Sequence, residues 1–136
     1  MRKPGRAGIL IIGGRKVLLA KRSKDGIYVP PEGEVRPEEN QLEAGRRIMG
    51  EEIGTEVKVA NFRYLTEIMT PGLPRFTFLI GNYAGGKIRV TRIRPYKYGR
   101  WDWYDWENLP KPLFQPLNAI KDMGHTPFSK IKNVPR

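Results

Sequence analysis

Apolar residues along the chain gather in short runs, each closed by glycine, proline or charged residues. The runs Gly8–Ile12 and Lys16–Ala20 flank the glycine pair 13–14, and such continuous apolar stretches are typical of buried strands. Ile27–Val29 is a shorter extended piece that two prolines end. Later runs are rich in β-branched and aromatic residues. The later strands predicted in this way are Glu56–Met69, Arg75–Tyr83, Lys87–Val90 and Trp101–Trp106.

Two segments follow a helical period instead. A helix is predicted from Glu38 or Glu39 to about Glu52, and Gly54 suits the position after its end. A second helix is predicted over Leu113–Met123. Strands, one helix, more strands and a final helix predict an α+β sandwich. The residues expected to be largely buried, including the stripe of the first helix, are Ile9, Ile11, Leu18, Leu42, Met49, Ile53, Phe78 and Trp103.

The length of 136 residues suits a chain that buries its own core. We expect a single domain over residues 1–136, with short basic extensions at 1–8 and 129–136. The absence of cysteine excludes disulfides, thiol nucleophiles and zinc–thiolate sites. No apolar run approaches the roughly 18 residues that a membrane-spanning helix needs. The expected protein is soluble and intracellular, and its basic start leaves mitochondrial and cytoplasmic locations open.

The net charge of +11 is unevenly distributed along the chain. Residues 32–56 hold eight of the 14 acidic residues and form an acidic segment within a basic chain. Residues 57–100 contain nine lysines and arginines against Glu67 alone. A solvated surface would account for a mild excess of basic residues, but a net charge of +11 favours attraction to a polyanion.

The densest basic segment, Gly86–Arg100, contains six basic residues and no acid. The first of them alternate along the predicted strand and share one face, while the others follow beside Tyr96 and Tyr98. Cations next to aromatic rings suit contacts with phosphates and unpaired bases, so this segment is a candidate RNA-binding surface. The alternative is a solvated edge strand whose charges oppose self-association. The candidate residues are Lys87, Arg89, Arg92, Arg94, Lys97 and Arg100.

The stretch Gly33–Thr55 resembles the Nudix box, a motif of glycine, glutamate and arginine at fixed spacing. Glu39 follows Gly33 at the family's distance, and Arg47 comes at its expected place further on. The resemblance extends to Trp101–Pro110, which is similar to a late strand of MutT-like nucleotide diphosphatases. It implies a Nudix-type α/β/α sandwich with a mixed central sheet. The remaining box residues in register are Met49, Glu51, Glu52 and Gly54.

In the Nudix family the box helix offers glutamates to magnesium, which bridges the substrate's diphosphate and helps to activate a water. Positions 48, 51 and 52 share one helical face, and the family has glutamate at all three. This sequence has Ile48, Glu51 and Glu52. Ile48 supplies no oxygen, whereas Mg²⁺ needs hard oxygen ligands in near-octahedral geometry. Arg47, which would orient the missing glutamate, is expected to pair with Glu51 or Glu43.

Other departures from the family's pattern point the same way. Glu32 replaces the first glycine of the usual glycine pair, and Thr55 replaces the closing aliphatic residue. Gly45 and Gly50 lie inside the predicted helix, where each costs roughly 1 kcal/mol relative to alanine. Arg100 stands before the late aromatic strand, where the subgroup has an acid.

These observations support two functions of different classes. The favoured one is a degenerate Nudix domain, without full catalytic activity, that serves as a structural or RNA-contacting component of a larger assembly such as a ribonucleoprotein. It requires no cofactor, and its partners are RNA, other proteins or both. The alternative is an active Mg²⁺-dependent Nudix hydrolase that cleaves a nucleoside diphosphate linkage, with Glu51 and Glu52 as metal ligands and Arg47 supporting them. Nucleotide binding without turnover lies between the two.

Overall fold

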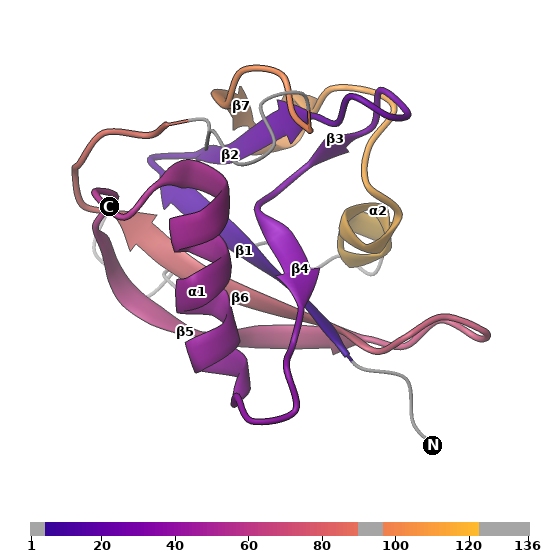
Figure 1. Ribbon diagram of the computed structural model, residues 1–136. Coiled ribbons are helices and arrows are strands. Elements are labelled where there is room, and N and C mark those ends of the chain that lie inside the picture. The colour runs from indigo at the N-terminus through magenta and orange to yellow at the C-terminus, as the bar shows by residue number, and fades with distance from the viewer. Residues whose placement is uncertain (1–4, 90–96, 123–136) are drawn as a thin grey trace, which may run out of the picture.

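The computed structural model describes residues 5–89 and 97–122, which build a seven-stranded mixed sheet with a helix against each face (Figure 1). The strands run in the order β3-β2-β1-β6-β5, while β4 pairs with β1 and β7 pairs with β2. Only β1 and β6 pair in parallel among these strands. The strands are β1 (Arg6–Gly13), β2 (Lys16–Lys21), β3 (Tyr28–Val29), β4 (Glu32–Glu34), β5 (Val59–Ile68), β6 (Phe76–Tyr83) and β7 (Asp102–Asp105).

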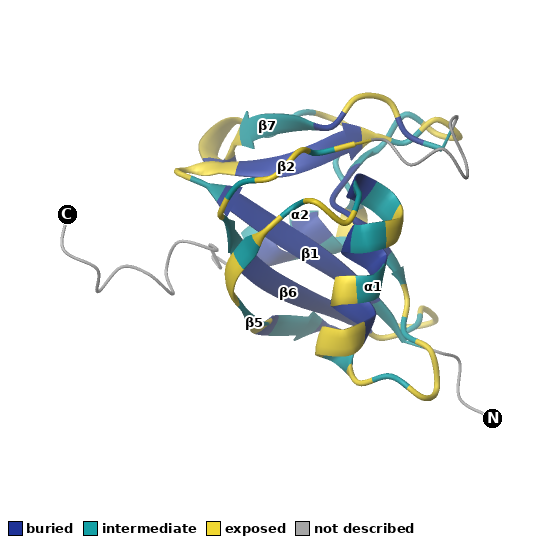
Figure 2. Cartoon of the chain, turned by 60° about the vertical axis from the view of Figure 1, so that its left-hand side comes forward, coloured by how far each residue is buried: buried dark blue, intermediate teal, exposed yellow. Residues whose placement is uncertain are grey.

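Strand β1 separates two layers of core. Ile9 and Ile11 point into the layer under helix α1 (Gln41–Ile53), whereas Leu10 and Ile12 point into the layer under helix α2 (Gln115–Asp122). This alternation follows from the two-residue period of a strand. Both central strands, β1 and β6, are buried along most of their length (Figure 2). The helices therefore cover opposite faces of one sheet, which confirms the predicted α/β/α sandwich.

Helix α1 begins at a reciprocal cap. The backbone N–H of Glu43 donates to Asn40 Oδ1 at 2.8 Å, and the backbone N–H of Asn40 donates to Glu43 Oε1 at 2.9 Å. Two otherwise unsatisfied donors at the helix start are paired in this way. The helix consequently starts later than the predicted Glu38 or Glu39, and Glu43 is engaged in the cap.

A glycine inside α1 allows the helix to lie close to the sheet. A Cβ atom added at Gly45 would overlap Leu79 of β6 and Phe62 of β5. The helix-propensity cost of this glycine is therefore offset by close packing of the helix against both strands. The buried face of α1 consists of Ala44, Gly45, Ile48, Met49 and Ile53.

Most of the predicted core is buried, but two of its members are not. Leu42 is 40% exposed, because it lies in the first turn of α1 and the buried face of this helix begins only at Ala44. Trp103 is only partly buried, because it lies on β7 at an edge of the sheet, where its ring packs against Tyr83 at 5.3 Å between centroids. In the same aromatic segment Trp101 and Trp106 are buried instead.

The prediction of a strand over Lys87–Val90 is wrong for the residues of this range that the structure describes. Gly85 and Gly86 adopt positive φ angles of 109° and 94°, and the chain turns back over the end of α1. There the backbone N–H of Arg89 donates to the Ile53 carbonyl at 2.8 Å. Arg89 therefore satisfies a carbonyl at the helix C-terminus rather than a neighbouring strand. Val90 lies outside the described residues.

The other boundaries shift by a few residues. Helix α2 falls inside the predicted Leu113–Met123, and β4 is a short strand that the sequence pattern does not predict. Arg6–Gly8, assigned above to a basic extension, belong to β1, because they pair with both β4 and β6. The extension at 129–136 lies outside the described residues. Within the described ranges, no helix is long and apolar enough to cross a membrane.

The two ends of the α1 stripe differ in burial, which makes a matched pair of substitutions. Ile53→Ala removes a fully buried side chain and is expected to lower the free energy of unfolding by about 2–5 kcal/mol. Leu42→Ala, at an exposed site, is expected to cost less than about 1 kcal/mol. Urea unfolding followed by circular dichroism checks both values. Equal losses in the two variants would contradict the arrangement of α1 on the sheet.

Candidate functional site

The guanidinium of Arg47 joins the loop after β4 to helix α1. Its Nε and one terminal nitrogen donate to both oxygens of Glu39, at 2.6 and 2.9 Å. The same terminal nitrogen donates to the Glu34 carbonyl at 2.7 Å, and the other donates to Glu51 Oε1 at 3.0 Å. Arginine can hold such a set because its planar fork carries five N–H donors. The predicted pairing with Glu51 is confirmed, whereas Glu39 takes the place expected for Glu43.

Arg47 also shifts the acidity of its partner. The hydrogen bonds from the Arg47 guanidinium lower the pKa of Glu39 from 4.5 to about 2, with further help from the backbone N–H of Arg36. Glu39 thus remains a carboxylate at any physiological pH. Its role in this structure is to anchor the loop, because both of its oxygens accept from Arg47.

Ile48 belongs to the hydrophobic core. Its side chain is 1% exposed and packs with Ala44, Met49 and Ile53 in the layer under α1. It also lies directly against Gly33, where an added Cβ would come within 3.3 Å of Ile48 Cγ1. The position at which the family's third glutamate would stand is therefore filled by a packed aliphatic side chain.

The carboxylates of Glu51 and Glu52 each contact basic side chains. Glu51 is half exposed and pairs with Arg47 and, at 3.7 Å, with Arg36. The Glu52 side chain is only 11% exposed, and its Oε1 accepts from Lys97 Nζ at 3.3 Å and from the Tyr98 hydroxyl. Burial first, and then the hydrogen bond to Glu52, raise the pKa of Tyr98, so this phenol stays protonated and can donate.

The side chains at positions 48, 51 and 52 do not fit a magnesium centre. Magnesium requires an octahedral set of hard oxygen ligands, and a catalytic site must hold several of them open to the ion. Glu51 and Glu52 are instead paired with arginine and lysine, and Ile48 adds no oxygen. In the part of the chain that the structure describes, no three histidine, cysteine, aspartate or glutamate side chains form a metal-binding group.

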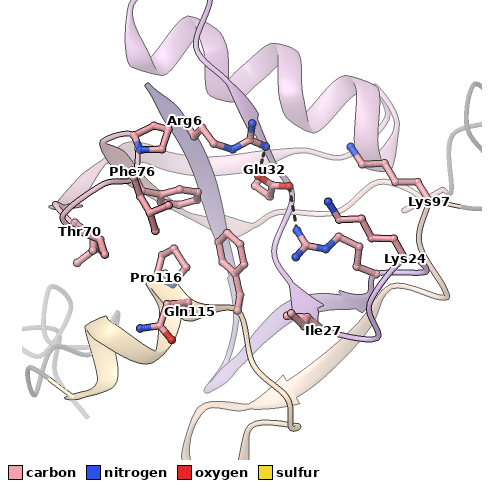
Figure 3. Close-up of a pocket in the computed structure, with 14 residues that line it drawn as sticks. Arg6, Lys24, Ile27, Glu32, Thr70, Phe76, Lys97, Gln115 and Pro116 are labelled. Atoms are coloured by element: carbon pink, nitrogen blue, oxygen red, sulfur yellow. Dashed lines mark hydrogen bonds and ion pairs between the residues drawn. The ribbon is translucent and has the colours of Figure 1, made fainter. Parts of the chain in front are cut away.

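Lys97, the partner of Glu52, also lines a pocket of about 650 Å³. Lys24 and Lys97 reach in from one side, and Phe76 and Pro116 lie across from them (Figure 3). Glu32 is the acidic side chain in the lining. The pocket thus has a cationic side and an apolar side. Its basic members are Arg6, Arg22, Lys24 and Lys97, and its apolar members include Ile27, Ile68, Leu73, Phe76 and Phe114.

Glu32 is a buried carboxylate in the wall of the pocket. It is 4% exposed, and its two oxygens lie 2.6 Å from Arg6 and 3.9 Å from Arg22 (Figure 3). A buried acid needs this compensation, because removing a carboxylate from water costs several kcal/mol. Glu32 stands where the family has glycine. Its carboxylate therefore pairs with two arginine side chains in the wall of the pocket.

Three of the predicted RNA-binding residues pair with acidic side chains in the described part of the chain. Arg89 pairs with Glu56 at 2.6 Å, Lys97 pairs with Glu52, and Arg100 pairs with Asp102 at 3.5 Å. Lys87 is described, but it is not part of a strand. The other two candidates, Arg92 and Arg94, lie outside the described residues.

Sequence reasoning missed most of the pocket. Its lining comes from β1, the β2–β3 loop, β4, β6 and the start of α2, which are far apart in the chain. Arg6, Lys24 and Phe114 carry no local motif that marks them. The available signals were Lys97, a candidate for phosphate contact, and Glu32, a charged residue directly after two prolines at a position where the resemblance expects glycine.

Comparisons with known proteins agree with this architecture. The model of the NUDIX domain matches residues 1–119. The crystal structure of a MutT NUDIX hydrolase from Burkholderia pseudomallei is similar with a TM-score of 0.71 at 21% identity, covering 90% of this chain and 98% of that one. A NUDIX hydrolase from Nitrosomonas europaea gives a TM-score of 0.69 at 14% identity, covering 92% and 75%. The solution structure of the E. coli ORF135 protein gives 0.64 at 20%, covering 99% and 96%. At these identities the likeness shows a shared fold.

The Arg47–Glu39 pair predicts a stability change in acid. Because the pKa of Glu39 is lower in the folded chain, its stabilising effect is full above pH 4.5 and is lost as the pH falls toward 2. Glu39→Gln is therefore expected to destabilise the protein at pH 7, by an amount that shrinks below pH 4.5. Urea unfolding of both proteins across this range measures the difference, with Glu38→Gln at the exposed neighbouring site as control. A difference independent of pH would contradict the pairing.

Proposed function

Because the NUDIX domain model spans most of its length, this chain belongs to the Nudix family, and we propose that it binds a phosphorylated nucleotide in the pocket without efficient magnesium-dependent cleavage. The two-sided lining of the pocket is the observation that carries this proposal. Phosphates favour basic side chains, while a planar base favours contact with apolar and aromatic groups. Both environments occur within one cavity of about 650 Å³, inside the usual size range of ligand sites.

The cationic side of the pocket suits a chain of phosphates. Arg6 is held in place by Glu32, and Arg22 is held by Asp25 at 2.8 Å and more distantly by Glu32, so part of the entropy of ordering their side chains is already spent before a ligand arrives. Lys24 is exposed and adds a positive charge at the rim. Phe76 and Phe114 pack edge to face at 5.2 Å between centroids, and the Arg22 guanidinium lies 5.9 Å from the centre of the Phe114 ring. The two rings offer a firm apolar wall against which a base can lie.

The weakness of catalysis follows from the box helix. Ile48 is in the core, and the two remaining box carboxylates are neutralised by neighbouring bases. Cleavage of a diphosphate linkage needs a group that activates water and a cation that offsets the charge of the leaving phosphate. In this chain the residues around Glu52 can bind and orient phosphates, but they supply neither a free carboxylate nor a metal-ligand set.

An active hydrolase is the second candidate, and membership of the Nudix family favours it. Glu51 and Glu52 keep their box positions, and Arg47 still anchors the box loop to the helix. If bound, magnesium would be held by these two glutamates and would supply charge neutralisation and an activated water. This function requires Glu52 to leave Lys97 and Tyr98, and Glu51 to leave Arg47.

Binding and turnover can be separated in one set of proteins. We expect isothermal titration to show ADP binding to the native chain, and phosphate or pyrophosphate release from nucleotides to fall far below about 1 s⁻¹, the low end of ordinary enzymes. Lys24→Met should weaken ADP binding by about tenfold or more, because a hydrogen bond to a charged group contributes about 1.5–3 kcal/mol and 1.4 kcal/mol is tenfold. Lys58→Met, which removes the same charge outside the pocket lining, is the control.

Two further variants decide between the candidates. Ordinary turnover by the native chain that Glu52→Gln abolishes would establish the hydrolase and overturn the proposal of binding without efficient cleavage. Ile48→Glu restores the family's residue and is expected to raise turnover if the missing ligand limits catalysis. Absence of nucleotide binding to the native chain would remove the pocket from consideration in either case.

A role in contact with RNA, as a component of a larger assembly, is supported by the net charge of +11. If residues 87–100 bind phosphates, RNA affinity should fall with salt at a log–log slope of roughly −0.7 to −0.9 per contact. Replacing Arg89, Arg92 and Arg94 by glutamine should flatten this slope by up to about three contacts, with little change in thermal stability. Fluorescence anisotropy with a labelled RNA over a salt series measures it. A slope unchanged by the substitutions would remove this segment from the interface.

A further inference from the structure

The surroundings of Glu52 contain a cation that belongs to the protein itself. Glu52, in the last turn of the box helix, has little exposure to solvent, and its Oε1 accepts from both Lys97 and Tyr98. A poorly solvated carboxylate is stable only when an opposite charge compensates for its lost hydration. Here the ammonium of Lys97 provides this charge at 3.3 Å, and the Tyr98 hydroxyl adds a donor.

Backbone hydrogen bonds hold Lys97 in this place. The Lys97 carbonyl accepts from the Ser23 N–H at 2.8 Å, and the Gly99 N–H donates to the Lys21 carbonyl at 2.7 Å. The segment is thereby fixed to the end of β2 on both sides of Tyr98. The Lys97 ammonium also lies 5.1 Å from the centre of the Tyr98 ring, a distance suited to a cation–π contact. Its position is thus set by the fold and not only by its attraction to Glu52.

Charge balance leaves little attraction for a second cation. Glu39 and Glu51 are balanced by Arg47 and Arg36, and Glu52 is balanced by Lys97. The neighbouring pocket lining adds Arg6, Arg22 and Lys24, set against Glu32 and against Asp25, which pairs with Arg22 at 2.8 Å. At separations of a few ångströms, each uncompensated positive charge repels a divalent ion even in water. A divalent ion would therefore meet a region of net positive charge.

We infer that Lys97 is the resident cation of this site, and that it takes the place at Glu52 that the resemblance assigns to a divalent metal, so that phosphate groups are bound without metal. The ligand half of this inference rests on the proposed function. An ammonium has three N–H donors, and Glu52 uses one of them. Lys97 also lines the pocket, so its other donors can reach a phosphate there. One side chain thereby neutralises the box carboxylate and binds the anionic ligand.

The first experiment measures metal binding with no nucleotide present. Titration of Mn²⁺, followed by electron paramagnetic resonance, is expected to show no saturable site on the native chain at millimolar concentration. The double variant Lys97→Met with Ile48→Glu frees Glu52 and restores the third carboxylate, and it should bind Mn²⁺ at least about tenfold more tightly than the native chain. Lys58→Met with Ile48→Glu is the matched control, since it has the same charge change away from the pocket.

The native chain alone suffices if a variant does not fold. A saturable Mn²⁺ site on the native chain that Glu52→Gln removes would overturn the inference. Equal Mn²⁺ affinity in the double variant and its control would overturn it too, because Lys97 would then have no influence on the metal position.

The second experiment measures ADP binding in EDTA and in Mg²⁺. The inference predicts equal dissociation constants in the two buffers, a loss of about tenfold or more in Lys97→Met, and recovery in Lys97→Arg. Binding that requires Mg²⁺ would overturn the role of Lys97 while leaving the pocket as a nucleotide site. Absence of ADP binding in both buffers would instead overturn the proposed function and the ligand half of the inference. The Mn²⁺ result would still decide whether Lys97 holds the metal position.

Discussion

The four hydrogen bonds of Arg47 are the interaction on which the rest of the site depends. They tie the Glu34 carbonyl at the end of β4 and the Glu39 carboxylate on the following loop to Glu51 on helix α1. The loop must follow this path for β4 to pair with β1 and for Glu32 to enter the pocket wall. Without Arg47, two carboxylates and a carbonyl would lose a shared donor. The Nudix box thus persists here as a structural device, whatever its chemistry.

Helix α1 keeps the box residues that have structural roles but lacks a carboxylate at one position of the family's metal-binding face. The residues that hold the box together, Gly33, Glu39 and Arg47, are all present, whereas Ile48 has joined the hydrophobic core. Glu52 has meanwhile acquired lysine and tyrosine partners from the segment before β7. The aliphatic side chain at Ile48 and the pairing of Glu52 with Lys97 have the same electrostatic effect. Both reduce the negative charge that draws a divalent metal, and both leave the fold undisturbed.

The sequence could predict the fold because its signals are local. The apolar runs predicted β1, β2 and β6. The spacing of the box residues predicted α1 and the pairing of Arg47 with Glu51. The predictions for Leu42 and for the segment 87–89 were wrong for a common reason. The spacing of apolar residues does not indicate where a helix or strand ends relative to the sheet. Leu42 lies beyond the buried part of its helix, and Gly85 and Gly86 redirect the chain to the end of α1.

The site was less predictable because its contacts join distant residues. Lys97 and Glu52 are 45 positions apart, and Arg6 and Glu32 are 26 apart. No local pattern indicates that a lysine in a basic segment will neutralise a box glutamate rather than bind RNA. The aliphatic residue at a glutamate position of the box, Ile48, was visible in the sequence, but the contact of Lys97 with Glu52 became evident only in three dimensions.

A crystal structure of the native chain grown with MnCl₂, with anomalous scattering recorded at the manganese edge, shows whether Lys97 or a metal ion occupies the position beside Glu52. If Lys97 is the resident cation, there is no anomalous peak beside Glu52, and the Lys97 ammonium lies within hydrogen-bonding distance of the Glu52 carboxylate. A manganese peak coordinated by Glu52, with Lys97 turned away from it, would show that the site binds metal and would favour the metal-dependent hydrolase.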